Sequence, residues 1–302
     1  MTSATDLLKT AIETEANAVE ETLQHLIPLL KNSGKLTEAM RYAVLGAGKR
    51  LRAFLAVTGS RLLGQSVETA LRVGAAIECV HAYSLIHDDL PCMDDDDLRR
   101  GKPSTHIQYG DALALLAGDS LQTSAFEILL EKATSPSAEI RSELALGLSR
   151  ASGVNGMAGG QVLDIEGEKK SLNIDQIRQI HAMKTGALIR FSAEAGAIIA
   201  GLSQDNPKRQ ALFAYGKHLG TAFQIADDIL DATGTAEEIG KTAGKDAASG
   251  KSTYISCLGL DGAREEARRV MHEAIKALEV FEDSKEVHLL SAFAHYVIER
   301  QN

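Results

Sequence analysis

The sequence is poor in aromatic residues and proline. It has no tryptophan, and Phe, Tyr and Trp together make up 4% of its 302 residues. Because aromatic side chains supply much of the buried area in most proteins, this core must instead be built from aliphatic residues and alanine. The chain contains only five prolines. In a sequence rich in Ala, Leu and Glu, so few helix breakers favour long helices.

Cysteines are also scarce. Cys79, Cys92 and Cys257 lie far apart and form no CxxC pair, which argues against a disulfide framework and against a zinc site. The chain has no run of about 18 uninterrupted apolar residues, and its N-terminus shows no basic segment followed by an apolar one. These absences predict a cytoplasmic protein without a transmembrane segment.

Positive charge is in deficit. The sequence has 32 Lys and Arg residues against 41 Asp and Glu residues, which gives a formal net charge of −9. A protein that binds nucleic acid regardless of sequence needs a basic face, so this composition argues against nucleic acid as a partner. Any polyanion would have to bind in a local positive pocket.

Apolar residues recur at intervals of three and four along nearly the whole chain, a pattern typical of amphipathic helices. Beyond the N-terminal segment, this pattern predicts helices over residues 67–87, 109–132, 138–152, 174–200 and 263–300. We find no strand-like alternation, no repeat of fixed period and no linker rich in Pro, Gly and Ser. The sequence therefore predicts one all-α domain that spans residues 1–302.

Three segments interrupt the helical pattern. Gly46–Arg52 is a basic glycine turn that opens a helix, and Leu90–Ser104 combines prolines with dense charge. Ala232–Ser252 contains four glycines and three lysines. Long loops in compact domains are usually functional, so this last segment is a candidate lid.

Two clusters of aspartates are the strongest local signals. Six carboxylates fall within the ten residues of Asp88–Asp97, at the end of an apolar helix. A second cluster comprises Asp227, Asp228 and Asp231 on another apolar helix. Asp227 and Asp231 are four residues apart, so they lie one above the other on that helix.

Such oxygen-only clusters suit a hard cation. Mg²⁺ typically binds through one or two carboxylates, several waters and substrate phosphates. A single acidic helix end is as often a solvated surface as a metal site. Two acidic clusters on otherwise apolar helices favour a site in which both clusters share metal and diphosphate. Calcium storage is disfavoured, because the EF-hand spacing is absent.

The spacing within the first cluster predicts a bend. Asp88 and Asp94 are six residues apart, or about 600° of helix, and cannot share a face of a continuous helix. Pro91 lacks a backbone N–H and disfavours helical conformation at Leu90. We therefore expect the chain to turn at Pro91 and to bring Asp94 back toward Asp88.

Basic residues near these clusters could bind anions. Lys49 and Arg52 are three residues apart at an expected helix start, where free N–H groups also favour anions. Arg99 and Arg100 follow the first cluster directly. His81 lies two turns before Asp88 on roughly the same face of the helix. For His81 taken alone, a core histidine with satisfied hydrogen bonds is the simpler interpretation. For Thr185 taken alone, a structural role is likewise simpler than a functional one.

A P-loop is excluded. Gly240-Lys241-Thr242 and Gly250-Lys251-Ser252 both look like the end of a Walker A motif. The earlier glycine that the motif requires is replaced by Thr235 and Lys245, and no hydrophobic strand precedes either segment. A nucleotide kinase built on a P-loop is therefore not expected.

Taken together, the motifs resemble those of the trans-isoprenyl diphosphate synthase family, and within it the bacterial farnesyl diphosphate synthases. The resemblance runs from about Tyr42 to the C-terminus. It comprises DDxxxxD with RRG at Asp88–Gly101, FQxxDDxxD at Phe223–Asp231, GKRxR at Gly48–Arg52, GGQxxD at Gly159–Asp164, KTG at Lys184–Gly186 and GKST at Gly250–Thr253.

This resemblance implies a homodimer of large helical bundles of the isoprenoid synthase type, each with a central active-site cavity. It implies that dimethylallyl or geranyl diphosphate loses diphosphate and that the cation is attacked by isopentenyl diphosphate. The product of this 1′-4 condensation would be (2E,6E)-farnesyl diphosphate. Three Mg²⁺ ions, for which Mn²⁺ could substitute, would clamp the allylic diphosphate.

The resemblance also implies roles for individual residues. The metal ligands would be Asp88, Asp89, Asp94, Asp227, Asp228 and Asp231. The allylic substrate or its diphosphate would be contacted by Arg99, Lys184, Thr185, Gln224 and Lys241, with Lys251 near the lid and the leaving diphosphate. Isopentenyl diphosphate would be bound by Gly48, Lys49, Arg52, His81 and Arg100. Catalysis would fall to Lys184, Thr185, Gln224 and Arg99, which stabilise the developing charges.

Product length depends on the depth of the cavity. Tyr83 and Ser84 precede Asp88 by five and four residues, so they lie about one turn below the metals. A bulky Tyr83 would stop a growing chain, as in producers of fifteen-carbon chains; the alternative is that it only packs against a neighbouring helix. Its substitution by Ala should then lengthen the product toward geranylgeranyl diphosphate.

Three rival functions remain. The nearest is a geranylgeranyl diphosphate synthase, which differs only in product length. A terpene cyclase would not need the Gly48–Arg52 anion site and is usually richer in aromatic residues that cradle cations. A non-catalytic subunit that binds divalent cations would bind metal without diphosphate and show no turnover.

Overall fold

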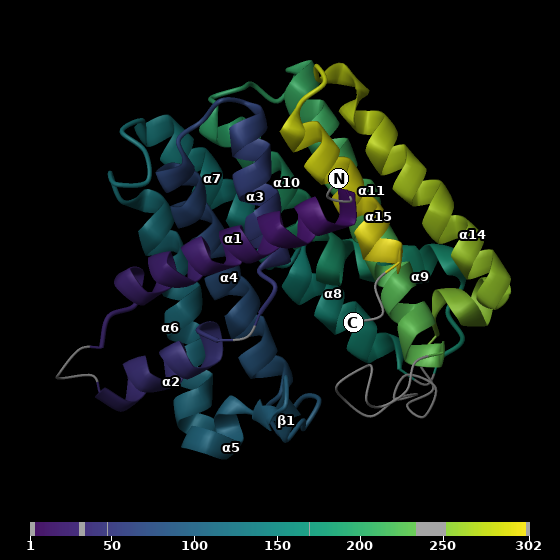
Figure 1. Cartoon of the computed structure of the whole chain (residues 1–302). Coiled ribbons are helices and arrows are strands. Elements are labelled where there is room, and N and C mark those ends of the chain that lie inside the picture. Colours follow the sequence, from purple (N-terminus) through teal and green to yellow (C-terminus); the bar gives the residue numbers. More distant parts are fainter. Residues whose placement is uncertain (1–3, 30–33, 47, 169, 234–251, 300–302) are drawn as a thin grey trace.

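The computed structural model describes residues 4–29, 34–46, 48–168, 170–233 and 252–299. Its helices are α1 (Ala4–Leu26), α2 (Gly34–Val44), α3 (Leu51–Leu62), α4 (Val67–Asp88), α5 (Thr105–Tyr109), α6 (Asp111–Leu130), α7 (Ala138–Ser152), α8 (Met157–Gly167), α9 (Ile174–His181), α10 (Ala187–Ile199), α11 (Pro207–Thr233), α14 (Tyr254–Ala277) and α15 (Lys285–Glu299). A π-helical turn, η1 (Ala182–Gly186), joins α9 to α10, and a 3₁₀ turn, η2 (Leu278–Val280), follows α14. The predicted all-α fold is confirmed (Figure 1).

One small β element was not expected. The two-residue strands β1 (Leu98–Arg99) and β2 (Lys102–Pro103) form an antiparallel hairpin just after the first aspartate cluster. Its turn residues Arg100 and Gly101 both have positive φ, 53° and 74°. Glycine adopts this conformation without a steric penalty, which explains how so short a hairpin forms in an otherwise helical chain.

Helix 138–152 is confirmed at both ends, and helix 67–87 is one residue longer than predicted. Three predicted helices are divided by breaks that periodicity does not reveal. Residues 109–132 are interrupted at Gly110, whose φ of 86° is left-handed. Residues 263–300 belong to two helices, because Ser284 caps α15 by accepting a hydrogen bond from the backbone N–H of Val287. The predicted helix 174–200 is broken by the π turn η1.

The core is aliphatic and rich in alanine, as the composition predicts. Helix α10 is buried almost all round and packs against α3, α7 and α11. Glycine makes its closest contact with α3 possible, since a Cβ built on Gly196 would lie 2.4 Å from the carbonyl carbon of Gly59. The helices around α10 thus form one packed bundle.

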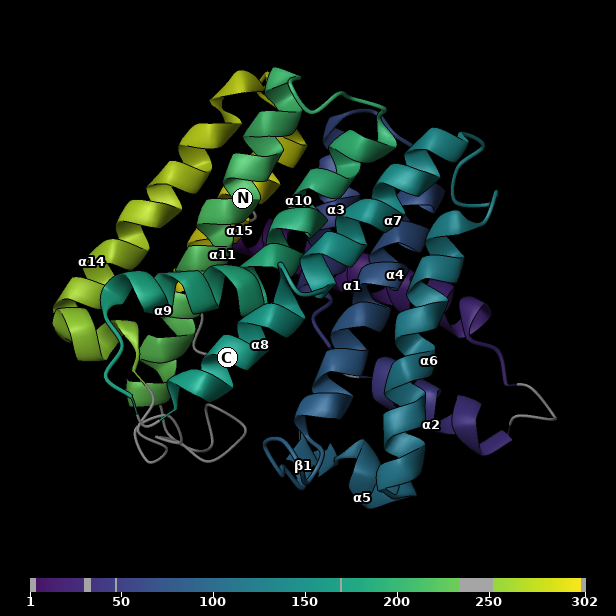
Figure 2. The ribbon, with the colours of Figure 1, turned by 180° about the vertical axis from the view of Figure 1, so that it is seen from behind.

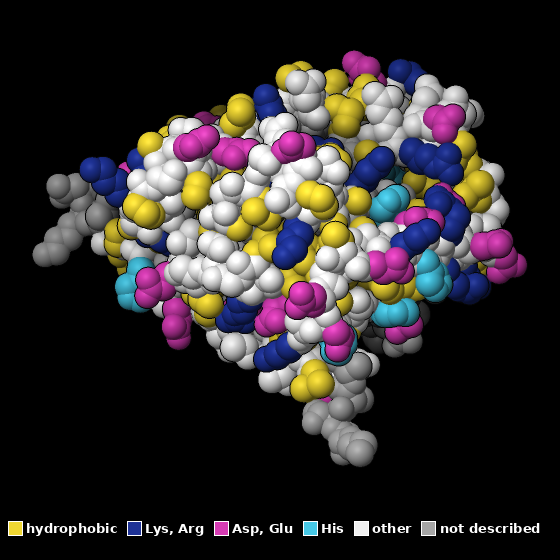
Figure 3. Space-filling view, turned by 90° about the horizontal axis from the view of Figure 1, so that it is seen from above, with side chains coloured by type: hydrophobic (Ala, Val, Ile, Leu, Met, Phe, Trp, Pro, Cys, Tyr) yellow, Lys and Arg dark blue, Asp and Glu magenta, His cyan; other side chains and the backbone are white. Residues whose placement is uncertain are grey.

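This packing places both aspartate clusters at one end of the molecule. Helices α4 and α11 both run toward the lower side of the view in Figure 1, and each carries its aspartates near its C-terminal end. Figure 2 shows the same arrangement from behind, with α8 and α9 lying near the end of α11. At the opposite end of the molecule, acidic and basic side chains are mixed over the surface (Figure 3).

Helix α6 is the one helix among the described residues that is long and apolar enough to cross a membrane, by length and composition alone. It packs against α4, and Ala114, Ala117 and Leu121 on its inner side are buried. Its outer side exposes Leu115 and Leu116, at 46% and 52%. The high hydropathy therefore has two origins, a core face and an exposed apolar face.

Candidate active site

The first aspartate cluster begins where α4 ends. Asp88 is the last residue of α4, and a turn follows in which the N–H of Met93 donates to the carbonyl of Leu90 at 2.8 Å. The N–H of Asp94 then donates to the carbonyl of Asp88, also at 2.8 Å. The predicted bend at Pro91 is therefore confirmed, and it returns Asp94 to the end of the helix.

The Asp88 carboxyl lies in an environment that opposes its ionisation. Burial, together with the charges of Asp94 and Asp89, raises its pKa to about 6, and Lys184 on η1 partly offsets this rise. A carboxylate held near another acid and away from water favours a cation beside it. The effect of Lys184 on the pKa of Asp88 shows that Lys184 lies near the first aspartate cluster, although it is almost a hundred residues further along the chain.

If Asp88 binds Mg²⁺, as the sequence predicts, its raised pKa makes the requirement for Mg²⁺ depend on pH. Above pH 7 Asp88 is ionised and available to Mg²⁺, whereas below its pKa of about 6 a proton competes for the same oxygens. We therefore expect the Mg²⁺ concentration for half-maximal activity to be constant from pH 7 to 8. It should rise by roughly tenfold per pH unit below the pKa. Magnesium titrations of the initial rate between pH 5 and 8 measure this effect, and a requirement independent of pH would contradict it.

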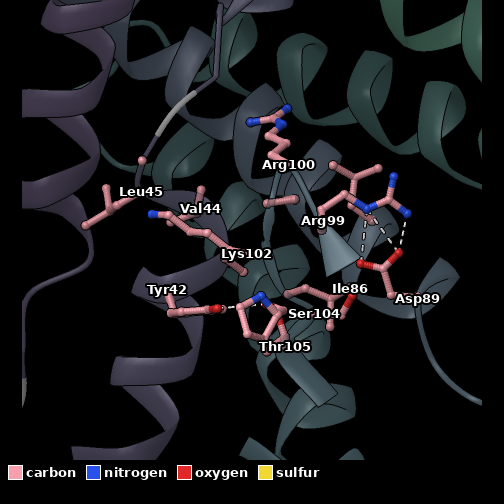
Figure 4. Close-up of a pocket in the computed structure, with 15 residues that line it drawn as sticks. Tyr42, Val44, Leu45, Ile86, Asp89, Arg99, Arg100, Lys102, Ser104 and Thr105 are labelled. Carbon is pink, nitrogen blue, oxygen red and sulfur yellow. Dashed lines mark hydrogen bonds and ion pairs between the residues drawn. The ribbon is translucent and has the colours of Figure 1, made fainter. Parts of the chain in front are cut away.

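Asp89 faces in another direction. It is 2% exposed, and both of its oxygens are held by Arg99, whose Nε lies 3.0 Å and 3.1 Å from them while Nη2 also donates to Oδ1 (Figure 4). Burial raises the pKa of Asp89, and the bonds from Arg99 lower it. This bidentate pair fixes the hairpin β1–β2 to the end of α4.

In the second aspartate cluster, too, one aspartate is half-buried and its neighbour is buried and hydrogen-bonded. Asp227 is half-buried and accepts a hydrogen bond from Nε2 of Gln224 at 3.2 Å. Asp228 is 8% exposed and accepts a hydrogen bond from the backbone N–H of Tyr254 at 2.8 Å. Asp231 is half-buried, one turn beyond Asp227. Neighbouring residues on a helix point about 100° apart, so only one of the first two aspartates faces the cavity.

A cavity of about 430 Å³ joins these elements. The residues predicted from sequence that line it come from the turn before α3, from α3, α4, the hairpin, η1 and α11: Gly48, Lys49, Arg52, His81, Arg100, Thr185, Gln224 and Asp227. The structure thus brings many of the predicted anion-binding residues together with Asp227 of the second cluster. The lining residues do not include Lys184 or any aspartate of the first cluster. Arg99 on the hairpin and Asp89 at the end of α4 line a neighbouring pocket instead (Figure 4).

Positive charge is concentrated in this cavity. Burial and the charges of Arg52 and Arg100 hold the pKa of His81 well below its usual range, so His81 is neutral at pH 7. Burial and the charges of Arg50 and Arg99 lower the pKa of Arg100. Cations this close repel one another, and a bound anion would relieve the repulsion. The acidic protein therefore does contain a local positive pocket.

Sequence reasoning gave no role to two charged residues on this cavity. Arg50 is buried with a left-handed φ of 49°, and it pairs with Glu78 on α4 at 3.3 Å and with Glu20 on α1 at 2.6 Å. Glu78 also accepts a hydrogen bond from the N–H of Ala53 at 3.3 Å. The pair holds the turn that carries Lys49. Arg50 lies within the GKRxR motif, whereas no sequence signal marks Glu78.

The π turn η1 presents Lys184 and Thr185. Lys184 forms an ion pair with Asp164 on α8, with 2.6 Å between Nζ and Oδ2. Helix α8 approaches so closely that a Cβ on Gly160 would lie 2.2 Å from the backbone nitrogen of Lys184. On the other side, a Cβ on Gly220 would lie 2.9 Å from Cα of Gly186. Single π turns within helices are frequent at functional sites, and this one is held in place by glycines.

This contact predicts the effect of Gly160→Ala. The added methyl group would overlap the Lys184 backbone, and overpacking of this kind costs about 1–3 kcal/mol. We expect a lower melting temperature. We also expect activity to fall further than the loss of folded protein explains, because the added methyl group displaces Lys184. Gly34→Ala is the matched control, since a Cβ there meets nothing within 4 Å. Equal effects of the two substitutions in thermal melting and in rate would contradict this prediction.

Within the described ranges, no group of three His, Cys, Asp or Glu side chains converges closely enough to hold a metal ion. The donors still fit Mg²⁺, because this ion is commonly bound by one or two carboxylates and completed by water and substrate phosphate. Lys241 and Lys251 lie outside the described residues, as does most of the Ala232–Ser252 segment that we expected to be a lid.

The fold and the site define an all-α protein with a positive cavity that Asp227 of the second aspartate cluster lines. The chain belongs to the polyprenyl synthetase family, whose model matches residues 33–292. It is 45% identical over 280 residues to a farnesyl diphosphate synthase of Escherichia coli, covering 91% of this chain and 92% of that protein. It is also 44% identical to the large subunit of a heterodimeric geranylgeranyl pyrophosphate synthase of Arabidopsis thaliana, covering 96% and 79%. The crystal structure of an FPP/GFPP synthase from Zymomonas mobilis has a TM-score of 0.87 and 42% identity, covering 97% and 99%.

Proposed function

We propose that this protein is a prenyltransferase that makes (2E,6E)-farnesyl diphosphate. It would condense isopentenyl diphosphate first with dimethylallyl diphosphate and then with geranyl diphosphate. The observation that carries the proposal is one cavity lined by Lys49, Arg52 and Arg100 together with Gln224 and Asp227. Such a cavity suits two anionic substrates bound side by side. The similarity to farnesyl diphosphate synthases over nine-tenths of the chain supports the same activity.

The first chemical step would be cleavage of the allylic C–O bond. Mg²⁺, when bound, supplies positive charge that stabilises the departing diphosphate, and the predicted ligands for it are Asp88, Asp89, Asp94, Asp227, Asp228 and Asp231. Arg99 and Lys184 would bind the same diphosphate oxygens. The oxygens of Thr185 and Gln224 would stabilise the carbocation, because preorganised dipoles act strongly where water is excluded.

The second step would form the new C–C bond. Gly48, Lys49, Arg52, His81 and Arg100 would hold the diphosphate of isopentenyl diphosphate, with neutral His81 as a hydrogen-bond donor. The double bond of this substrate would attack the allylic cation, and the resulting cation would lose a proton to the released diphosphate. Holding both substrates in one cavity replaces a bimolecular encounter with an oriented reaction.

Several further features belong to the same proposal. We infer a single polyprenyl synthetase domain over residues 1–302, a cytoplasmic location, and three Mg²⁺ ions that Mn²⁺ can replace. Nucleic acid is not an expected partner. Lys241 and Lys251 would act on the diphosphates from the Ala232–Ser252 segment.

The deciding experiment supplies labelled isopentenyl diphosphate together with dimethylallyl or geranyl diphosphate, with and without Mg²⁺, and separates the products by chromatography. We expect farnesyl diphosphate as the main product and no turnover without the metal. A twenty-carbon product would favour geranylgeranyl diphosphate synthesis. Cyclic products from a single prenyl diphosphate would favour a cyclase, and absence of any condensation would reject the proposal.

We further propose that the protein is a homodimer that associates through α6. The outer side of this helix exposes Leu115 and Leu116 beside Ala112, and exposed apolar patches often mark protein–protein interaction sites. A second copy of the chain could cover it symmetrically, as most homo-oligomers do. The double substitution of Leu115 and Leu116 by Glu should therefore shift the protein from dimer to monomer.

Light scattering after size-exclusion chromatography measures this shift. Leu258→Glu on α14 is the control, since this leucine is 39% exposed but lies on another helix. We expect the control to leave the mass of the particle unchanged. A dimer that survives the double substitution, or a monomeric wild type, would show that α6 is not the interface.

A further inference from the structure

Glu78 is a buried acid among the basic residues of the cavity. It lies on α4, is 3% exposed, and lines the 430 Å³ cavity together with Lys49, Arg52 and Arg100. A negative charge beside an anion weakens its binding by repulsion. The charge of Glu78 therefore does not explain why an acid lies at this place, and its contacts must.

The first contact of Glu78 is with Arg50, on the turn before α3. Nη1 of Arg50 lies 3.3 Å from Oε2 of Glu78, and the two side chains are 5% and 4% exposed. Arg50 has a left-handed φ of 49°. A residue other than glycine keeps this conformation only where the surrounding contacts impose it. The ion pair is such a contact, and it acts on the backbone between Lys49 and Arg52.

The second contact is with the start of α3. Oε1 of Glu78 accepts a hydrogen bond from the backbone N–H of Ala53 at 3.3 Å. Ala53 is in the first turn of α3, where N–H groups have no partner within the helix. Arg50 is the N-cap residue, but its side chain caps none of them. Glu78 therefore supplies from α4 the cap that the turn itself lacks.

Both contacts fix the segment that carries the predicted ligands of isopentenyl diphosphate. Gly48, Lys49 and Arg52 of this segment line the cavity. From the other side, Glu20 on α1 holds Arg50 with 2.6 Å between Oε2 and Nη2. The turn is thus held between α1 and α4, and its displacement would move all three predicted ligands together.

We propose that Glu78 is a positioning residue for isopentenyl diphosphate, which fixes the Gly48–Arg52 turn without binding the substrate itself. This inference rests on the proposed function. Positioning and simple electrostatics predict opposite results when the charge of Glu78 is removed. If Glu78 acted only through its charge, its loss would tighten the binding of an anion. Because it holds the turn, its loss should weaken that binding.

Calorimetric titrations of the metal-free protein in EDTA distinguish the two accounts. One series uses isopentenyl diphosphate and a parallel series uses inorganic pyrophosphate. We expect Glu78→Gln to raise both dissociation constants about tenfold, which corresponds to the loss of roughly one charge-assisted hydrogen bond. Glu78→Asp keeps the charge and withdraws the carboxylate by one methylene group, so it should also weaken binding, by a smaller factor.

Glu15→Gln is the matched control. Glu15 is a buried acid on α1, at 2% exposed, and it pairs with Arg61 near the opposite end of α3. The substitution removes an equal charge from an ion pair of the same helix, away from the anion-binding turn. We expect a lower melting temperature for both glutamine variants. The dissociation constants should rise for Glu78→Gln and stay at the wild-type values for Glu15→Gln.

Initial rates provide a second measurement. In Glu78→Gln the KM for isopentenyl diphosphate should rise by the same factor as the dissociation constant. The KM for geranyl diphosphate should change little, because the turn does not carry the predicted ligands of that substrate. Equal increases in both KM values would indicate general damage to the fold and reject a positioning role.

The outcomes separate the inference from the proposed function. Wild-type or tighter binding by Glu78→Gln rejects the inference, as does a wild type that binds no pyrophosphate. If Glu78→Gln does not fold, unchanged affinity in Glu78→Asp rejects it instead. A wild type that binds isopentenyl diphosphate but condenses it with neither allylic substrate rejects the proposed function, and the binding titrations still decide whether Glu78 positions the turn.

Discussion

Asp88→Asn should lower kcat for condensation by about 10²–10³-fold, the loss typical when one group that stabilises a developing charge is removed. The substitution keeps the size of the side chain and removes its charge. Asp88 lies at the end of α4, next to Asp94 and within the influence of Lys184. Without the Asp88 carboxylate, the end of α4 would have less negative charge with which to hold the Mg²⁺ that is predicted to stabilise the departing diphosphate.

Asp95→Asn is the matched control for this prediction. Asp95 belongs to the same acidic run but is exposed and has a left-handed φ of 50°. Asparagine tolerates this conformation well, so the control removes an equal charge without strain. We expect wild-type rates for Asp95→Asn. Similar losses for both variants would mean that the net charge of the run matters rather than the position of Asp88.

The sequence predicts the parts of this structure that local physics determines. The amphipathic period locates α7 at Ala138–Ser152, because its apolar residues must face the core whatever surrounds them. The bend after Asp88 follows from Pro91, which lacks an N–H wherever it occurs. The resemblance to the family's motifs identifies eight of the residues that line the cavity.

Contacts between distant elements could not be predicted in this way. The partners of Asp89 and Asp228 are Arg99 and the N–H of Tyr254. In each cluster two adjacent aspartates look equivalent in sequence, and only the packing of the hairpin or of α14 makes the second one a buried acceptor. The π turn η1 also depends on contacts between distant elements, since α8 packs closely against it on one side and α11 on the other.

Product length is the part of the function that family membership leaves open. The similar proteins include a farnesyl diphosphate synthase, a geranylgeranyl pyrophosphate synthase subunit and an FPP/GFPP synthase, at 42–45% identity. We therefore predict that a few side chains below the first aspartate cluster set the product length, although the residues lining the 430 Å³ cavity do not include them. Tyr83 and Ser84 are the residues that we predict to do this.

Tyr83→Ala should change the main product from farnesyl to geranylgeranyl diphosphate. Tyr83 is on α4, about 7.5 Å along the helix axis from Asp88, and it is 9% exposed. Its ring meets the ring of His87 edge to face at 5.6 Å, and Gln122 on α6 bonds to its hydroxyl. These contacts hold the ring in one place, as a fixed floor requires. Ser84 on the next position has a small side chain that donates to the carbonyl of His81 at 2.9 Å.

Two variants make the assignment decisive. Tyr83→Phe keeps the ring and removes only the hydroxyl, so the product should remain farnesyl diphosphate. Ser84→Phe adds bulk nearer to the metals and should shorten the product toward geranyl diphosphate. Truncating a buried aromatic side chain to Ala typically costs about 3–5 kcal/mol, so melting curves must show that Tyr83→Ala is folded. If the folded variant still makes only the fifteen-carbon product, the ring packs between α4 and α6 without limiting the chain, and the floor lies deeper in the bundle.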